Sequence, residues 1–103
     1  MSMVHRKSTK TGTGNTPTML YAYGSYGICI DPCFHRNILP YLDRGMIYVI
    51  AHIRGGGEMG RYWYEEQGKY LNKRNTFSDF INCAEHLIEN KFTNPDKLAI
   101  EGR

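Results

Sequence analysis

The longest apolar stretch of the chain, Met46–Ile53, ends at three consecutive glycines, Gly55–Gly57. It is almost continuously apolar and rich in β-branched residues, which is typical of a parallel strand covered on both faces. Parallel strands are joined by crossover connections, and the crossover is usually a helix. We therefore predict an α/β fold in which the glycines form a loop at the carboxyl end of this strand.

Further strands and one strong helix are predicted around this stretch. Thr18–Tyr23 has strand character, and Leu98–Ile100 opens another strand after a turn. Thr76–Lys91 is the clearest helix, and we expect Thr76 and Asp79 to form a capping box at its start. The apolar residues of this helix recur at helical spacing and predict its buried face: Phe77, Phe80, Ile81, Ala84, Leu87 and Ile88.

The first half of the chain is less regular. Met1–Lys7 is predicted to be a short edge strand, and the Thr/Gly-rich segment Ser8–Pro17 a hairpin-type connection. Asp31, followed by proline, predicts a helix start, and Gly45 marks the end of that helix. Pro40 indicates that the helix is short or kinked. The order of elements predicts an α/β sheet but does not choose among Rossmann-like, flavodoxin-like and hydrolase-like sheets.

Composition excludes several classes of function. With 103 residues the chain is one small domain, and its net charge of +3 is too small and too scattered to indicate a nucleic-acid partner. No apolar run approaches the roughly 18 residues of a membrane span. The odd number of cysteines favours free thiols in a reducing compartment. Cys29, Cys33 and His35 lack a fourth ligand, so we expect no metal and no cofactor.

The glycines after the central strand formally match a dinucleotide fingerprint, with Gly55, Gly57 and Gly60 as its glycines. A nucleotide-binding α/β module is therefore one alternative. That function needs a helix to begin at the glycines and an acidic residue at the end of the next strand. The sequence instead continues with bulky aromatic residues, which disfavours this alternative.

A second loop whose residues could take part in catalysis, Tyr21–Gly27, lies at the predicted end of a strand. Ligand sites of α/β folds are found at such strand ends. A tyrosine held in such a loop can direct its hydroxyl at a developing oxyanion. The competing interpretation is that these tyrosines only fill space, and composition alone favours it, because aromatic clusters usually belong to a core.

Taken together, several segments resemble the catalytic domain of oligopeptidase B enzymes, in the prolyl oligopeptidase family of serine peptidases. The segments that carry this resemblance are Tyr21–Gly27, Asp43–Gly45, Arg54–Gly60, Trp63–Glu65, Lys73–Phe77, Cys83–Glu85 and Glu101–Arg103. The resemblance implies that residues 1–103 form a partial α/β-hydrolase sheet, with its second to fifth strands and two helices.

The resemblance also implies roles for single residues. Tyr23 matches the tyrosine that completes the oxyanion hole, and Tyr26 matches an aromatic residue beside the substrate pocket. Asp31 matches the first of two aspartates that recognise a basic residue next to the scissile one. Cys33 stands where the second aspartate would be. Gly102 matches the first glycine of the Gly-x-Ser-x-Gly nucleophile elbow, whose serine would follow directly after the last residue.

The function implied is that of a cytoplasmic serine endopeptidase that cleaves short peptides after Arg or Lys. The nucleophile, acid and base would lie outside residues 1–103, so we expect the chain alone to be inactive. The remainder of the catalytic domain and a β-propeller domain would be its partners in an intact enzyme. A non-catalytic interaction fragment is a further alternative.

Overall fold

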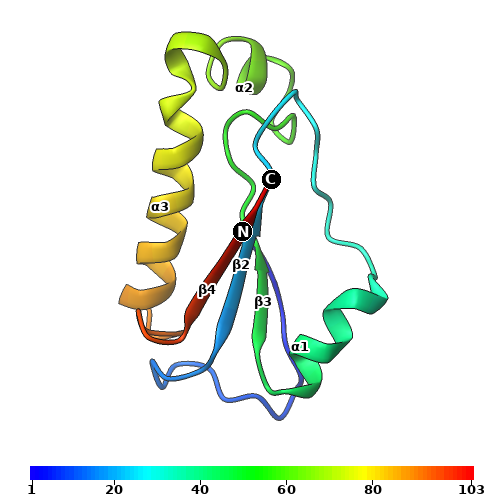
Figure 1. Ribbon diagram of the computed structural model, residues 1–103, viewed down its shortest axis with the longest axis vertical. Coiled ribbons are helices and arrows are strands. Elements are labelled where there is room, and N and C mark those ends of the chain that lie inside the picture. Colours follow the sequence, from blue (N-terminus) through cyan, green and yellow to red (C-terminus); the bar gives the residue numbers. More distant parts are fainter.

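The computed structural model describes all residues, 1–103, and contains a four-stranded mixed sheet (Figure 1). The strands are β1 (Ser2–Val4), β2 (Thr18–Ala22), β3 (Ile47–Ile50) and β4 (Leu98–Gly102). Their order across the sheet is β1-β3-β2-β4. The strands β2, β3 and β4 run parallel, whereas β1 pairs antiparallel with β3.

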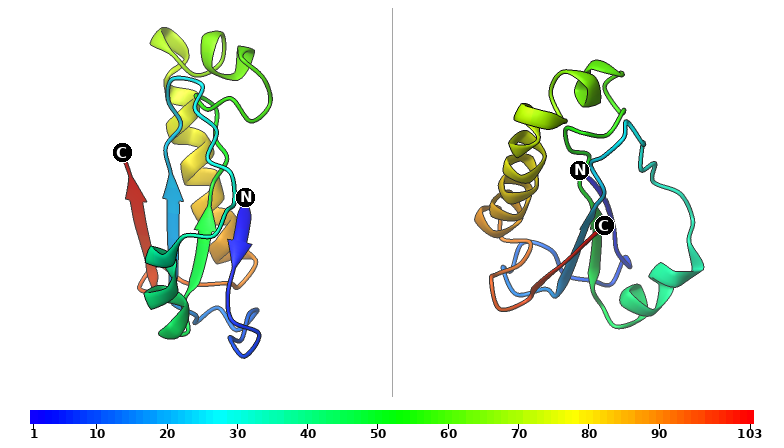
Figure 2. Two further views of the ribbon diagram at one scale, coloured as in Figure 1. Left: turned by 90° about the vertical axis from the view of Figure 1, so that its right-hand side faces the viewer. Right: turned by 45° about the horizontal axis from the view of Figure 1, so that its top comes forward.

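Helical segments cover both faces of this sheet. They are η1 (Arg36–Ile38), α1 (Leu39–Asp43), α2 (Tyr62–Glu65), η2 (Tyr70–Asn72) and α3 (Arg74–Glu89). The long helix α3 lies along one face and the short α1 lies on the opposite face (Figure 2). The segment that contains α2 and η2 lies beyond the carboxyl ends of the strands (Figure 1).

The core lies between α3 and the sheet. Its buried residues are Leu20, Ala22, Ile47, Val49, Ala51, Ile53 and Leu87. Most of them come from β2, β3 and the residues just after these strands, which confirms the central position predicted for the apolar stretch. On the opposite face of β3, the half-buried Tyr48 ring lies 5.8 Å from the ring of Tyr41 in α1.

The edge strand at the N-terminus is confirmed, but the hairpin predicted after it is wrong. Strand β3 lies between β1 and β2, so the two strands joined by residues 8–17 are not neighbours. This connection instead packs against the turn that follows α3. The Gly14 amide donates to the Lys91 carbonyl at 2.7 Å, and the Asn94 side chain donates to the Gly14 carbonyl at 2.8 Å.

The helix predicted to begin at Asp31 begins later. His35 is still extended, with φ −128° and ψ 121°, and regular α-helix begins only at Leu39. Pro40 therefore lies in the first turn of α1, where its missing amide costs nothing, and it does not kink the helix. The helix ends before Gly45, which has φ +77°, as predicted.

The second helix is confirmed, but its predicted capping box is wrong. The helix α3 begins at Arg74, so Thr76 lies inside its first turn. The Thr76 hydroxyl donates to the Arg54 carbonyl at 2.6 Å, and the Asp79 carboxylate accepts from Arg54. Both side chains bind a neighbouring loop and leave the first amides of the helix uncapped.

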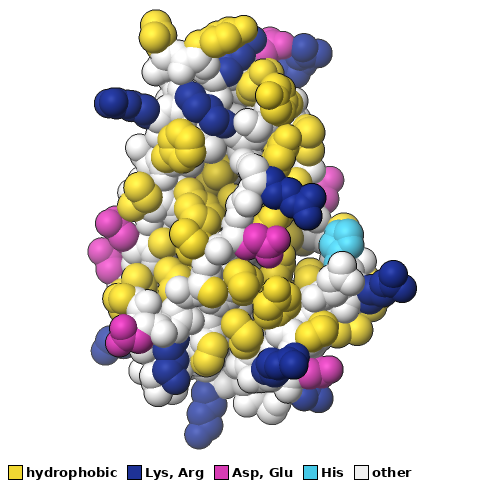
Figure 3. Space-filling view, viewed as in Figure 1, with side chains coloured by type: hydrophobic (Ala, Val, Ile, Leu, Met, Phe, Trp, Pro, Cys, Tyr) yellow, Lys and Arg dark blue, Asp and Glu magenta, His cyan; other side chains and the backbone are white.

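Part of the predicted buried face of α3 is exposed. Phe77 and Ile81 are 60% and 55% exposed, and Ile100 on the edge strand β4 is 64% exposed. Hydrophobic side chains run down the middle of the face formed by α3 and β4 (Figure 3).

None of the helices is both long enough and apolar enough to cross a membrane.

We predict that the purified 103-residue chain associates as its concentration rises, because an open sheet edge and exposed apolar side chains pair with other chains. Sedimentation velocity across a concentration series measures this. Ile100→Lys, which places a charge on the edge strand, should shift the distribution toward monomer. A monodisperse wild-type monomer with one sharp unfolding transition contradicts the prediction.

Candidate active site

The carboxyl ends of the parallel strands β2, β3 and β4 lie at one edge of the sheet (Figure 1). The loop Tyr23–Gly27 follows β2, and residues 51–57 follow β3. Gly102 ends β4 and is the register partner of Ala22. Ligands of open α/β sheets bind at this edge, so the fold brings the two loops singled out from the sequence to the place where a site is expected.

The two loops approach each other so closely that only glycine fits at their contact. A Cβ atom on Gly55 would collide with the carbonyl of Gly24, and one on Gly57 would collide with the carbonyl of Gly27. The Gly27 amide donates to the Gly55 carbonyl at 2.9 Å. Gly24 and Gly55 also have φ values of +69° and +107°, which side chains disfavour.

This packing gives the glycines a structural reason that requires no nucleotide. The Gly55 amide donates to the Trp63 carbonyl, and the Gly60 amide donates to the Gly57 carbonyl, both at 2.9 Å. The helix that follows them in the chain, α2, has four residues. A pyrophosphate needs free amides at the start of a longer helix, so the geometry does not favour the nucleotide-binding alternative.

The start of α3 binds the second of these loops through Arg54. The Arg54 side chain donates from Nε to Asp79 Oδ2 at 2.8 Å and from Nη2 to Asp79 Oδ1 at 2.7 Å. The Arg54 amide donates to Asp79 Oδ2 at 2.9 Å. Burial would raise the pKa of Asp79, but the hydrogen bonds from Arg54 outweigh it and leave that pKa below its usual value.

The first loop is held by Lys73, the residue just before α3. Its ammonium group donates to the Gly24 carbonyl at 2.6 Å and to the Ser25 hydroxyl at 2.9 Å. Burial lowers the pKa of Lys73. This contact could not be predicted from the sequence, because its partners lie almost fifty residues apart and follow no local pattern.

Tyr23 and Gly102, two of the predicted site residues, line one cavity of about 240 Å³. The half-buried Tyr23 directly follows β2, and Gly102 is the last residue of the neighbouring strand β4. The remaining wall contains Ile53, Phe77 and Phe80, among other residues. A tyrosine and a glycine from neighbouring strand ends thus line one largely apolar cavity, and a tyrosine hydroxyl fixed at such a place can stabilise an oxyanion.

The other predicted residues lie in separate cavities. Tyr26 is 72% exposed, with φ +55°, and its ring lies 6.0 Å from the ring of Tyr64. Asp31 is exposed and lines a polar cavity of about 510 Å³ that also includes Glu101 and Arg103. The structure does not bring either residue to the Tyr23 cavity, so their roles in substrate binding stay predictions.

A third group of residues was missed from the sequence. Ser2 Oγ lies 2.7 Å from His52 Nε2, and His52 Nδ1 lies 3.7 Å from Glu58 Oε1. Glu58 also accepts a hydrogen bond of 3.2 Å from the Ile30 amide. The order of groups is that of a catalytic triad, but Ser2 lies within the edge strand β1 and not at an exposed turn. His52 is half-buried and hydrogen-bonded.

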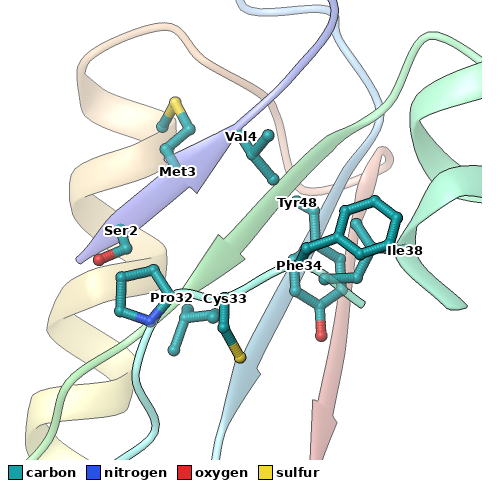
Figure 4. A pocket seen from close by; sticks show the side chains of 9 residues that line it. Ser2, Met3, Val4, Pro32, Cys33, Phe34, Ile38 and Tyr48 are labelled. Atoms are coloured by element: carbon teal, nitrogen blue, oxygen red, sulfur yellow. The ribbon is translucent and has the colours of Figure 1, made fainter. Parts of the chain in front are cut away.

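The cysteines are all unpaired, and Cys33 Sγ lies 3.0 Å from His35 Nε2. No group of three His, Cys, Asp or Glu residues comes together in a geometry that could hold a metal ion. Cys33 and Phe34 line an apolar cavity of about 310 Å³ between the edge of the sheet and residues 32–38 (Figure 4). This cavity is distinct from the one that contains Tyr23.

Comparison with known proteins defines the family to which this chain belongs. The sequence profile of the prolyl oligopeptidase family matches residues 32–103. Oligopeptidase B from Leishmania major superimposes with a TM-score of 0.93 at 57% identity, over 98% of this chain. Oligopeptidase B from Trypanosoma brucei, with covalently bound antipain, gives a TM-score of 0.92 at 63% identity over 98% of this chain. Protease 2 from Moraxella lacunata is 54% identical over 86% of this chain.

The chain belongs to the prolyl oligopeptidase family, and its fold is the matching part of that family's α/β-hydrolase domain. It spans 14% of the length of the two oligopeptidase B structures and 13% of the length of Protease 2. The family resemblance inferred from the sequence is thereby confirmed, and so is the α/β-hydrolase fold.

Asp79→Asn should destabilise the chain by about 1–3 kcal/mol at pH 7, because Arg54 loses a charged hydrogen-bond partner. Urea unfolding at low protein concentration, followed by fluorescence of the single tryptophan, Trp63, measures this. Glu85→Gln on an exposed position of the same helix is the control, with a change within about 0.5 kcal/mol.

The effect of Asp79→Asn should also depend on pH. The folded-state pKa of Asp79 is lowered, so its stabilisation is complete above the unfolded pKa of about 3.9 and is lost as the pH falls through the folded value. The difference between wild type and variant should therefore shrink on acidification below about pH 4. A difference that stays constant with pH would show that the ion pair does not contribute.

Proposed function

We propose that this chain supplies the oxyanion-hole tyrosine, Tyr23, and the start of the nucleophile elbow, Gly102, to a serine oligopeptidase. That enzyme would cleave short peptides after Arg or Lys, with Tyr26 and Asp31 contacting the substrate. Residues 1–103 would be part of its catalytic domain, and a serine after Arg103 would be the nucleophile. The rest of the catalytic domain and a β-propeller would complete it. The unpaired cysteines support a reducing compartment, the cytoplasm.

The observation that carries this proposal is the shared cavity of Tyr23 and Gly102 at the carboxyl edge of the sheet. In acyl transfer, a serine attacks the carbonyl, a histidine takes the serine proton, and the carbonyl oxygen becomes an oxyanion. A serine two positions after Gly102 would lie at the same strand end as Tyr23. The tyrosine hydroxyl and a backbone amide could then donate to the same oxygen.

The test uses a chimera in which residues 1–103 replace the matching segment of the Trypanosoma brucei oligopeptidase B. With Tyr23→Phe, which removes only the hydroxyl, kcat on an arginine or lysine peptide should fall about 10²–10³-fold. Tyr62→Phe, an exposed tyrosine of α2, is the matched control and should leave kcat unchanged. A Tyr23→Phe kcat within about twofold of the unmutated chimera would assign Tyr23 to packing.

The isolated chain should have no peptidase activity, because Tyr23 and Gly102 alone provide neither nucleophile nor base. Turnover of a fluorogenic arginine or lysine peptide, with and without a serine-directed reagent, measures this activity. Ser2→Ala is the informative variant, since Ser2 and His52 form the one serine–histidine contact of the structure. Turnover that the reagent blocks and that Ser2→Ala abolishes would contradict the prediction and place a nucleophile on β1.

A further inference from the structure

The loop that carries Tyr23 depends on one side chain outside it. The next residue, Gly24, is buried, and no backbone amide donates to its carbonyl. Its donor is the Lys73 ammonium group, at 2.6 Å. The same ammonium donates to the Ser25 hydroxyl at 2.9 Å, so it binds both residues that follow Tyr23.

Removing this donor would leave a buried carbonyl unpaired, directly next to Tyr23 in the chain. An unpaired buried polar group costs about 1–3 kcal/mol, which the loop can avoid only by turning the Gly24 carbonyl toward solvent. That rotation would turn the Gly24–Ser25 peptide plane and release the backbone of Gly24, the residue that directly follows Tyr23. Gly24 has φ +69°, which glycine adopts without strain, so its own backbone preference does not hold the carbonyl in this orientation.

Lys73 is itself fixed by the surrounding structure. Its amide donates to the Tyr70 carbonyl, and its carbonyl accepts from the Thr76 amide, both at 3.1 Å. Thr76 in turn donates to the Arg54 carbonyl. The backbone of Lys73 is therefore held next to the loop after β3, while its ammonium group binds the loop after β2. Lys73 thus fixes the two loops relative to each other.

We propose that Lys73 is a positioning residue that sets the location of the Tyr23 hydroxyl for the developing oxyanion. This inference rests on the proposed function, because it assigns Lys73 a role only through Tyr23. Burial lowers the pKa of Lys73, which is consistent with an ammonium group enclosed between the loop and the helix start.

The test is a double-mutant cycle in the chimera, with Lys73→Met and Tyr23→Phe alone and together. Methionine keeps most of the length of the side chain and removes its donors. Lys73→Met alone should lower kcat about tenfold or more, since small misplacements of a catalytic group have effects of this size. KM should change less than about threefold, because the interaction improved by Lys73 forms only in the transition state.

In the Tyr23→Phe background, Lys73→Met should change kcat by less than about twofold, because the hydroxyl that it positions is already gone. Arg74→Met is the matched control: it removes a positive charge from the adjacent, exposed residue, whose carbonyl accepts a hydrogen bond from Ser78 within the same helix. It should leave kcat unchanged in both backgrounds. Lys73→Arg, which retains donors, should restore part of the kcat lost in Lys73→Met.

The outcomes separate this inference from the proposed function. Suppose that Tyr23→Phe lowers kcat strongly, and that Lys73→Met lowers kcat by the same factor with and without the Tyr23 hydroxyl. That result would overturn the positioning role and leave Tyr23 as the oxyanion donor. A Tyr23→Phe effect within about twofold would overturn both. If Lys73→Met does not fold, Lys73→Arg decides: its kcat loss must disappear in the Tyr23→Phe background, and a loss that persists there overturns the inference.

Discussion

The loops that follow β2 and β3 pack against each other at their glycines. A Cβ atom on Gly55 would collide with the Gly24 carbonyl, and one on Gly24 would collide with the side chains of Thr76 and Ile53. Because the loops touch, the ends of β2 and β3 are fixed relative to each other. Two polar side chains, Lys73 just before α3 and Asp79 within it, then bind one loop each. The candidate site is therefore held by backbone contacts and charged hydrogen bonds at its edge, while the apolar core lies below it.

Most of the elements could be predicted from the sequence, because their signals are local. The apolar run of β3 and the helical spacing of α3 each describe a segment that one layer of the fold buries. The failures concern pairing and helix starts. Nothing local shows that β3 lies between β1 and β2, which made residues 8–17 look like a hairpin. Asp31 has the residue type of a helix cap, but the chain stays extended through His35.

The candidate site was predicted in part, and largely through resemblance to a family. Position at a strand end indicated the loop of Tyr23, and the structure places Gly102 in the same cavity. Lys73 and the Ser2–His52–Glu58 group were missed, because each contact joins residues distant in sequence. Thr76 and Asp79 were assigned to a capping box for the same reason, since their partner is Arg54, more than twenty residues away. Contacts of this kind become visible only once the fold is known.

The role of Tyr23 is tested most directly by the structure of the chimera with a peptide inhibitor bound covalently to the nucleophilic serine. A covalently inhibited state is already known for the Trypanosoma brucei oligopeptidase B. We expect the Tyr23 hydroxyl to lie about 2.7–3.1 Å from the inhibitor oxygen that occupies the oxyanion position. The Lys73 ammonium group should remain bound to the Gly24 carbonyl. A Tyr23 hydroxyl directed away from that oxygen, with other donors in its place, would show that Tyr23 is not the oxyanion donor.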